Sequence, residues 1–417
     1  MISFWRIFSL EFLQLWRSKT LAMLLVASVA WMFAAPHCFR GDGTAEGLRE
    51  LTLHYSLGGV AALLAVALVI AAAGTLSKER EARRLQLSMV RPVRYFTLAF
   101  GRIAALTTAA ALTLAVATVI EGFRAGAEAP VCRHVLKPVM PSVQEEAAAM
   151  YESYIADPST PEEVKKAKKP VVLRLLASRA VDRYDTVATN GVGLWRFRLP
   201  VDAAAASARL KFSTMFDQRD EVAGALSLAT LSGAVSNITQ AVIEVPLAGA
   251  AVKADGGLVD FRFENHGSSE LMLRPRKDVE LLIPADGFLA NLLRCYLELV
   301  AMLALLIGFG VFLGSALGRP AALFTAVSVL LLSEMAPSVI EQYPDELETD
   351  RADAIGLAIT RFTYQATKPL SSLRPLEALS LDECLEPREA FRTLAVDFVL
   401  FPVLFAFLSA LVMPRKS

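Results

Sequence analysis

Long apolar runs separated by short polar stretches dominate the first and last parts of the chain. A helix that spans a bilayer needs about 20 mostly apolar residues, because the hydrocarbon core is about 30 Å thick and a helix rises about 1.5 Å per residue. Such runs are too long and too continuous for the alternating strands of a membrane β-barrel. They predict six transmembrane helices, at Thr20–Pro36, Tyr55–Leu76, Phe100–Ile120, Phe288–Leu317, Ala321–Met335 and Leu394–Met413.

The stretch before the first span, residues 1–19, has helical rather than continuous apolar spacing. Arg6, Arg17 and Lys19 are available for lipid headgroups, which is typical of a helix that lies in the membrane interface. The alternative is that the stretch is the frayed start of the first span. Large apolar side chains recur on one side of this helix, at Phe4, Phe8, Phe12, Leu15 and Trp16.

Between the third and fourth spans the pattern changes, and residues 121–287 predict an inserted α+β domain. Residues 142–182 have helical signals, and residues 193–285 alternate with the period of two that half-buried strands show. Turn residues at Asp255-Gly256-Gly257 and Asn265-His266-Gly267 separate the runs. We therefore expect a β-sandwich of seven or eight strands with a helical preface.

Basic residues in the short loops predict the orientation of the spans. The loop at 77–102 is rich in Arg and Lys, whereas the loop at 37–54 holds only Arg40 and Arg49. The loop at 77–102 and both termini are therefore expected in the cytoplasm, most simply across a bacterial inner membrane. The predicted order is an interfacial helix at 1–19, three spans within 20–120, an extracytoplasmic domain at 121–287, two spans within 288–338, an extracytoplasmic loop at 339–392, and the last span with its cytoplasmic tail at 393–417.

Composition narrows the classes of function. The 42 basic residues balance the 42 acidic ones, so there is no overall charge to attract nucleic acid. Four cysteines and four histidines are scattered along the chain, without the spacing of a metal site. There is no phosphate-binding loop and no hydrolase motif. We expect no catalytic residues, no bound metal and no directly bound cofactor.

Charged residues near the ends of the spans are candidates for a gate. Arg294 and Glu298 lie one turn apart at the predicted outer end of the fourth span, while Glu334 and Asp397 lie near the outer ends of the fifth and sixth. Ionisable groups within a membrane often mark a functional site. Arg294 and Glu298 are therefore a possible outer gate, and the alternative is that these side chains simply extend to the interface.

The fourth span also contains glycines at every fourth position. Gly310, Gly314 and Gly318 form a G-x-x-x-G-x-x-x-G run, and small residues at this spacing let helix backbones approach closely. The run predicts helix packing, either within one subunit or between two subunits.

The loop at 77–102 is more elaborate than a tether requires. Glu79, Arg80, Glu81, Arg83 and Arg84 predict a charged helix. A proline at position 92 ends this helix, and a second, amphipathic stretch leads into the third span.

Three patterns together resemble the permease subunits of ABC transporters of the ABC-2 type. The helix with Glu11 that ends in Arg17-Ser18-Lys19 is similar to the connecting helix of that family. The loop from Lys78 through Arg91-Pro92-Val93-Arg94 to Gly101-Arg102 resembles its first cytoplasmic loop, although Arg83-Arg84 replaces a usual Gly-Thr pair. The cytoplasmic N-terminus and six spans match as well, whereas many relatives have only a short loop in place of the inserted domain.

The resemblance implies partners and a mechanism. A cytoplasmic ABC ATPase subunit would supply the energy of ATP, and a second copy or a sister permease would complete the membrane pathway, surrounded by membrane lipid. The loop would couple the ATPase to the spans and drive export of a substrate that the sequence does not identify. The coupling residues implied are Glu79, Arg80, Glu81, Arg83, Arg84, Arg91, Pro92 and Arg94.

Two other classes of function remain open. A non-transporting scaffold would use its external β-sandwich to bind an envelope polymer or a protein partner. An intramembrane enzyme is the less favoured alternative, because the sequence has no catalytic cluster.

Overall fold

The computed structural model divides the chain into two compact units. The helical unit comprises Met1–Pro130 and Gly287–Ser417, and the β unit comprises Val131–Asp286. The structure describes residues 2–39, 45–81, 94–125, 131–139, 150–151, 154–156, 172–173, 176, 186–199, 206–211, 222–238, 242–249, 252, 257–267, 270–342 and 374–413.

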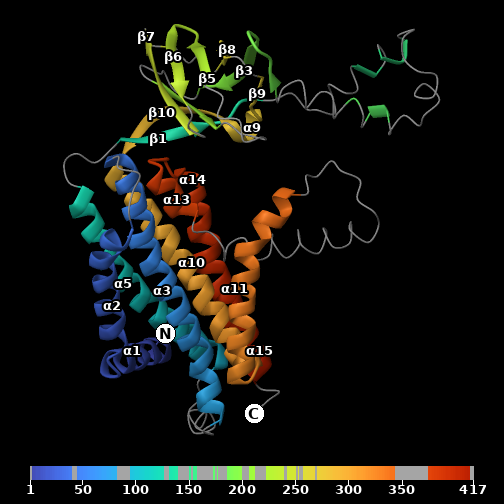
Figure 1. The fold of residues 1–417 in the computed structure, drawn as a ribbon. Helices are drawn as coiled ribbons and strands as arrows, with labels where there is room; N and C mark the ends of the chain where they lie inside the picture. The colour runs from blue at the N-terminus through green and yellow to red at the C-terminus, as the bar shows by residue number, and fades with distance from the viewer. Residues whose placement is uncertain are drawn as a thin grey trace. The chain divides into compact units, whose positions relative to one another are not determined.

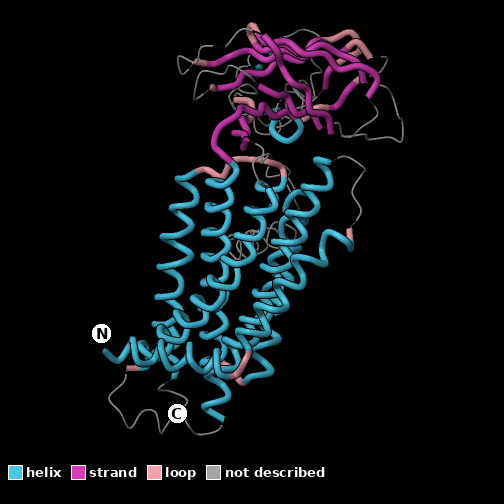
Figure 2. Tube along the Cα trace, turned by 90° about the vertical axis from the view of Figure 1, so that its left-hand side faces the viewer, coloured by secondary structure: helices cyan, strands magenta, loops and turns pink. Residues whose placement is uncertain are grey.

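The helical unit is a bundle crossed at one end by a short helix. In Figures 1 and 2, α2, α3, α5, α10 and α15 run side by side, and α1 lies across the end at which α3 stops and α5 starts, here named the α1 end. The opposite end is named the far end. The described elements are α1 (Ile2–Arg17), α2 (Thr20–Cys38), α3 (Ala45–Glu81), α5 (Tyr95–Ala125), α10 (Phe288–Ala316), α11 (Arg319–Gln342), α13 (Arg374–Ser380), α14 (Pro387–Thr393), η2 (Leu394–Leu400) and α15 (Phe401–Val412).

Five stretches of the described helices are long and apolar enough to cross a membrane. They coincide with five of the predicted spans and confirm that these are apolar helices of about the expected length. The predicted fifth span, Ala321–Met335, lies inside α11, which is a helix but is not one of these five, so the count of six stays a prediction. The five stretches are Thr20–Cys38, Leu51–Gly74, Tyr95–Ala125, Phe288–Ala316 and Pro387–Val412.

The α10 helix is the centre of the bundle. In its apolar segment 83% of the residues are buried, against 17% in the apolar segment of Pro387–Val412. It packs against α3, α5 and α15. Large apolar side chains on the surrounding helices point outward instead, and examples are Phe33, Val66, Leu112 and Phe407. This arrangement suits a bundle whose solvent is lipid.

The final span contains a stretch of π-helix, η2, between α14 and α15. The N–H of Phe401 bonds to the carbonyl of Val396, which is an i→i−5 bond. Pro402 follows at the start of α15. A proline has no N–H to donate and its ring crowds the preceding turn, and the wider π turn accommodates it.

The β unit contains one eight-stranded sheet, in the order β1-β10-β4-β7-β6-β5-β8-β3, and a two-stranded sheet of β2 and β9. The resolved pairings are antiparallel. The elements are β1 (Val131–Leu136), β2 (Thr186–Val187), β3 (Val192–Arg198), β4 (Ala206–Lys211), β5 (Val222–Leu228), β6 (Leu231–Ile238), β7 (Val242–Gly249), β8 (Leu258–Asn265), β9 (Leu271–Met272), the short helix α9 (Pro275–Asp278) and β10 (Val279–Gly287).

The large sheet curls around one core, which differs from two separate layers of a sandwich. Its halves join at a corner where β6 and β7 share only the pairs Leu231–Gly249 and Ser232–Ala248. At the free edges, the N–H of Val139, just after β1, donates to the carbonyl of Arg196 on β3 at 2.7 Å. Side chains from both halves meet in a single cluster that includes Trp195, Phe197, Leu210, Val245, Phe261 and Leu281.

The predicted strands from residue 193 onward are largely confirmed, but the hairpin of β5 and β6 was not predicted. Its sequence is rich in Ala, Gly and Ser, so the contrast between its two faces is weak. Its turn at Ala229-Thr230 has a positive φ of 50° at Ala229 without the Asn or Gly that signals such turns. In the predicted helical preface, the described residues are helical and include the buried side chains of Val172 and Leu176.

Candidate functional site at the α1 end

A sharp corner joins α1 to α2. Lys19 adopts a left-handed conformation with φ 59°, and the hydroxyls of Ser18 and Thr20 lie 2.8 Å apart beside it. The N–H of Ser18 still bonds to the carbonyl of Gln14, so α1 continues to its last turn before the chain changes direction. The Arg17-Ser18-Lys19 boundary expected from sequence is therefore the point where the chain leaves α1 and enters the first span.

An ion pair fastens α1 to the start of α5. The Nε of Arg102 donates to Oε1 of Glu11 at 2.8 Å. Arg102 is only 3% exposed, and the Glu11 side chain is 20% exposed. A buried guanidinium needs such a partner, because removing its carboxylate leaves a charge that is costly to bury. Two residues from separate sequence patterns, 91 positions apart, thus meet at one site.

Close packing surrounds this ion pair. A Cβ at Gly101 would approach Cγ2 of Ile7 to 2.8 Å, so the glycine is needed for α1 to lie this close. The rings of Phe4 and Phe100 are 5.5 Å apart. A glycine, an arginine and an aromatic ring on adjacent positions of α5 therefore form the seat of α1.

Four of the predicted coupling residues are among the described residues, and they lie where α3 stops and α5 starts. Glu79, Arg80 and Glu81 form the last turn of α3, so the predicted charged helix is helical up to residue 81 and is continuous with the preceding apolar helix. Arg94 is exposed just before α5, and its carbonyl accepts the N–H of Leu98 at 3.2 Å. Arg83, Arg84, Arg91 and Pro92 lie outside the described residues.

Two of the three glycines in the run pack against another helix of the same chain, and the third does not. A Cβ at Gly310 would lie 3.0 Å from the Cβ of Ala72, and one at Gly314 would overlap the carbonyl of Ala73. Both contacts are with α3. Gly318 lies beyond the end of α10 in open space, so it takes no part in this packing. The alternative of packing within one subunit is therefore the one observed for Gly310 and Gly314.

At the far end, α10 holds the chain between α13 and α14. The side chain of Asn291 donates to the carbonyl of Glu383 at 2.7 Å and accepts the N–H of Leu385 at 2.8 Å. Arg294 donates to the carbonyl of Leu385 at 3.2 Å. Arg294 thus secures a connecting segment, and Glu298 lies half-buried one turn further along α10. Sequence reasoning did not identify Asn291.

A second polar cluster at the far end joins α2, α3 and α5. Ser56 donates to Glu121, and Arg124 donates to Glu121 at 3.0 Å and to the carbonyl of Met32 at 2.7 Å. Glu121, 3% exposed, lies inside α5 rather than at the start of the external domain, where the sequence placed it. The i, i+3 spacing of Glu121 and Arg124 was the available signal.

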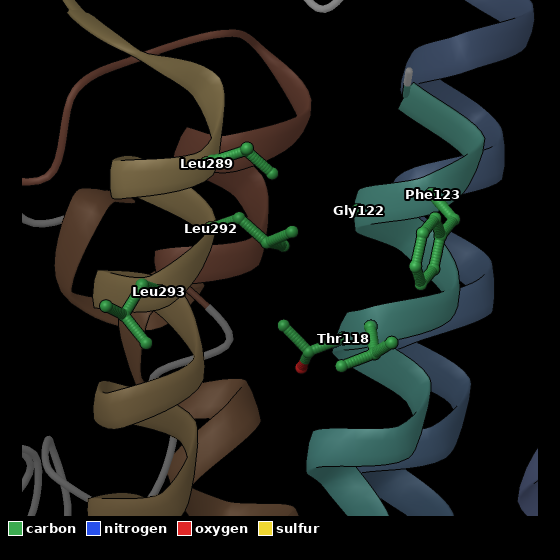
Figure 3. Close-up of a pocket in the computed structure, with 7 residues that line it drawn as sticks. Thr118, Gly122, Phe123, Leu289, Leu292 and Leu293 are labelled. Carbon is green, nitrogen blue, oxygen red and sulfur yellow. The ribbon is translucent and has the colours of Figure 1, made fainter.

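An apolar groove of about 440 Å³ lies beside this cluster, between α5 and α10. Figure 3 shows Leu289 and Leu292 facing Thr118 and Gly122 across it. Its lining includes one hydroxyl and no ionisable group. The groove therefore suits a hydrocarbon chain rather than a catalytic reaction.

The described residues include no group of three or more His, Cys, Asp or Glu side chains that would hold a metal. Comparison with protein families, with curated proteins and with solved structures finds no match to this chain.

Proposed function

We propose that this protein is the membrane-spanning subunit of an ABC-2 type transporter and exports a substrate with energy from a separate ATPase subunit. The proposal rests first on the Glu11–Arg102 ion pair. The α1 helix lies across the bundle, and a buried charge fastens it to α5, the span that follows the basic loop. This arrangement is suited to pass movement of that loop into the bundle.

The arrangement of the chain ends supports an even number of crossings. In Figure 1, α1 and the end of α15 lie at the α1 end, whereas α13 and α14 lie at the far end. The α10 helix ends at the α1 end, so the chain must return to the far end before α14 begins. The α11 helix, which packs against α10 and α3, starts that return. We take α11 as a further crossing, the fifth in chain order, which brings the total to six.

In the proposed mechanism, the loop between α3 and α5 sits in a groove of the ATPase. Closure of the ATPase pair displaces the loop and, through α5 and α1, shifts the bundle between two states, which ATP binding favours unequally. Asn291 and Arg294 would hold the far end closed in one state by keeping the segment before α14 on α10. The chain lacks a phosphate-binding loop, which fits a subunit powered by another chain.

The first test is co-purification with a co-expressed ABC ATPase subunit, such as one encoded next to this chain if its genome contains one. Charge reversal at Arg80, Arg83 and Arg84 is expected to reduce the bound ATPase by at least about tenfold, because like charges across an interface are strongly unfavourable. The matched control reverses Arg388 and Arg392, which are exposed on α14 at the far end. Equal retention of the ATPase by both variants would reject the proposed coupling loop.

A second variant tests the transmission step. Glu11→Gln keeps the size of the side chain but removes the charge that partners Arg102. We expect the ATPase to remain bound, while its rate of ATP hydrolysis in the reconstituted complex no longer differs from that of the free ATPase. If this protein binds no ATPase, the scaffold alternative is favoured. The β unit is then the part to test for ligands.

A further inference from the structure

The face of α1 turned away from α5 repeats one pair of residues. Trp5-Arg6 and Trp16-Arg17 are separated by 11 positions. Eleven residues make about three helical turns and a rise of roughly 16 Å. The two pairs therefore project from the same side of α1, near its two ends. Trp5 is 61% exposed and Trp16 is 63% exposed, and both arginines are exposed too.

The charge of this face has one sign. Glu11 is the only acidic residue of α1, and it points to Arg102 on the packed side. Among the described residues, neither Arg6 nor Arg17 forms an ion pair. Lys19, exposed at the corner after α1, adds a further positive charge. The Glu11–Arg102 contact thus leaves the outer face of α1 purely basic, with tryptophan beside each arginine.

This chemistry matches the headgroup layer of a membrane. Tryptophan concentrates at the boundary between hydrocarbon and water, and the planar guanidinium of arginine binds phosphate in a bidentate manner. Leu10 and Leu13, 68% and 48% exposed on the same side, would contact acyl chains. Figures 1 and 2 both show α1 lying across the bundle, as a helix in the plane of a membrane surface would.

We propose that the outer face of α1 is a binding site for anionic phospholipid, with one headgroup at each Trp-Arg pair. The occupant is membrane lipid rather than a protein, because exposed leucines, which suit acyl chains, lie between two Trp-Arg pairs, which suit headgroups. Lipid binding at this face requires only that the protein lies in a membrane, and it does not depend on the ATPase. Because the Glu11–Arg102 ion pair fastens α1 to α5, anionic lipid bound at this site would also affect the position of the first turns of α5.

The test uses the full chain in vesicles of phosphatidylcholine with increasing fractions of phosphatidylglycerol. Tryptophan emission is quenched with spin-labelled phosphatidylglycerol or, in parallel, spin-labelled phosphatidylcholine. The chain has four tryptophans, so subtracting the signal of a Trp5→Phe/Trp16→Phe variant removes Trp31 and Trp195. The difference reports on α1 alone.

We expect quenching of α1 at a lower concentration of phosphatidylglycerol than of phosphatidylcholine, with a preference that weakens as salt is added. Arg6→Gln/Arg17→Gln should weaken this preference by about fivefold per arginine, or roughly twenty-five-fold in total. Arg6→Lys/Arg17→Lys keeps both charges and should retain most of it. Arg388→Gln/Arg392→Gln removes two exposed charges at the far end and should leave it unchanged.

Three results would overturn the proposal. Equal quenching by both lipids would show that charge does not select the occupant, and an unchanged preference in the Arg6/Arg17 variant would place the anionic lipid elsewhere. Protection of Trp5 and Trp16 from both spin labels would show that another protein surface covers α1. Co-purification of the ATPase is measured separately, so failure here is distinguishable from failure of the transport proposal.

Discussion

The two units of this protein both have a buried apolar core, but they differ in where they place several of their large aromatic side chains. In the β unit, Phe197, Phe261 and Phe263 are almost completely buried inside the curled sheet. In the helical unit, Phe33 and Phe407 are 58% and 53% exposed on the outside of the bundle. The difference indicates two solvents, because water drives apolar groups inward whereas lipid does not.

The comparison also shows what holds each unit together. The β unit gains stability from apolar burial, and it holds an exposed ion pair, Arg196–Asp260, as well as a buried one, Arg209–Glu280. The helical unit relies on close backbone approach at Gly310 and Gly314, and on buried polar contacts such as Glu11–Arg102. Large apolar side chains and glycines therefore contribute differently in the two units, whereas the strength of an ion pair should follow its burial, and three measurements test this.

The largest expected effect is in the β core. Phe261→Ala should lower the free energy of unfolding of the β unit by about 3–5 kcal/mol, because Phe261 packs on Trp195 and Phe197. Trp195 emission measures it during denaturant titration, in a background where the other three tryptophans are replaced by Phe. The matched variant Phe407→Ala should cost only about 0.5 kcal/mol. A comparable loss at Phe407 would show that this face is buried against another protein and does not face lipid.

The next effect is at the glycines of α10. Gly314→Ala should destabilise the helical unit by roughly 1–3 kcal/mol, because the added methyl group overlaps the backbone of Ala73. Gly318→Ala, in open space, should change stability by less than about 0.5 kcal/mol. Thermal unfolding in detergent compares the two variants. A larger cost at Gly318 would indicate that the third glycine packs against a second subunit.

The smallest effect compares two ion pairs by double-mutant cycles. Glu11→Gln and Arg102→Gln should show a coupling energy of about 1–3 kcal/mol in denaturant titrations. The exposed pair, tested with Arg196→Gln and Asp260→Asn, should show only about 0.2–1 kcal/mol. Equal coupling in both cycles would mean that burial does not strengthen the contact between α1 and α5.

The elements of the fold followed from sequence wherever the pattern was strong. Continuous apolar runs located five helices that are long and apolar enough to cross a membrane, and alternation located most strands of the β unit. Prediction failed where the contrast between faces was weak, as in the β5–β6 hairpin. It also ended α5 too early, because Glu121 was read as the first polar residue of a new domain although Ser56 and Arg124 accommodate it inside the bundle.

The candidate site divides in the same way. The sequence by itself determined that residues 1–19 form an amphipathic helix, that a basic loop precedes Gly101-Arg102, and that α10 carries regularly spaced glycines. Only the tertiary structure decided that Glu11 meets Arg102, that Gly310 and Gly314 contact α3, and that Asn291 holds the segment before α14. The physical reason is the separation of interacting residues along the sequence. Periodicity and composition record the average surroundings of each helix, whereas a specific partner many residues away depends on how the helices pack.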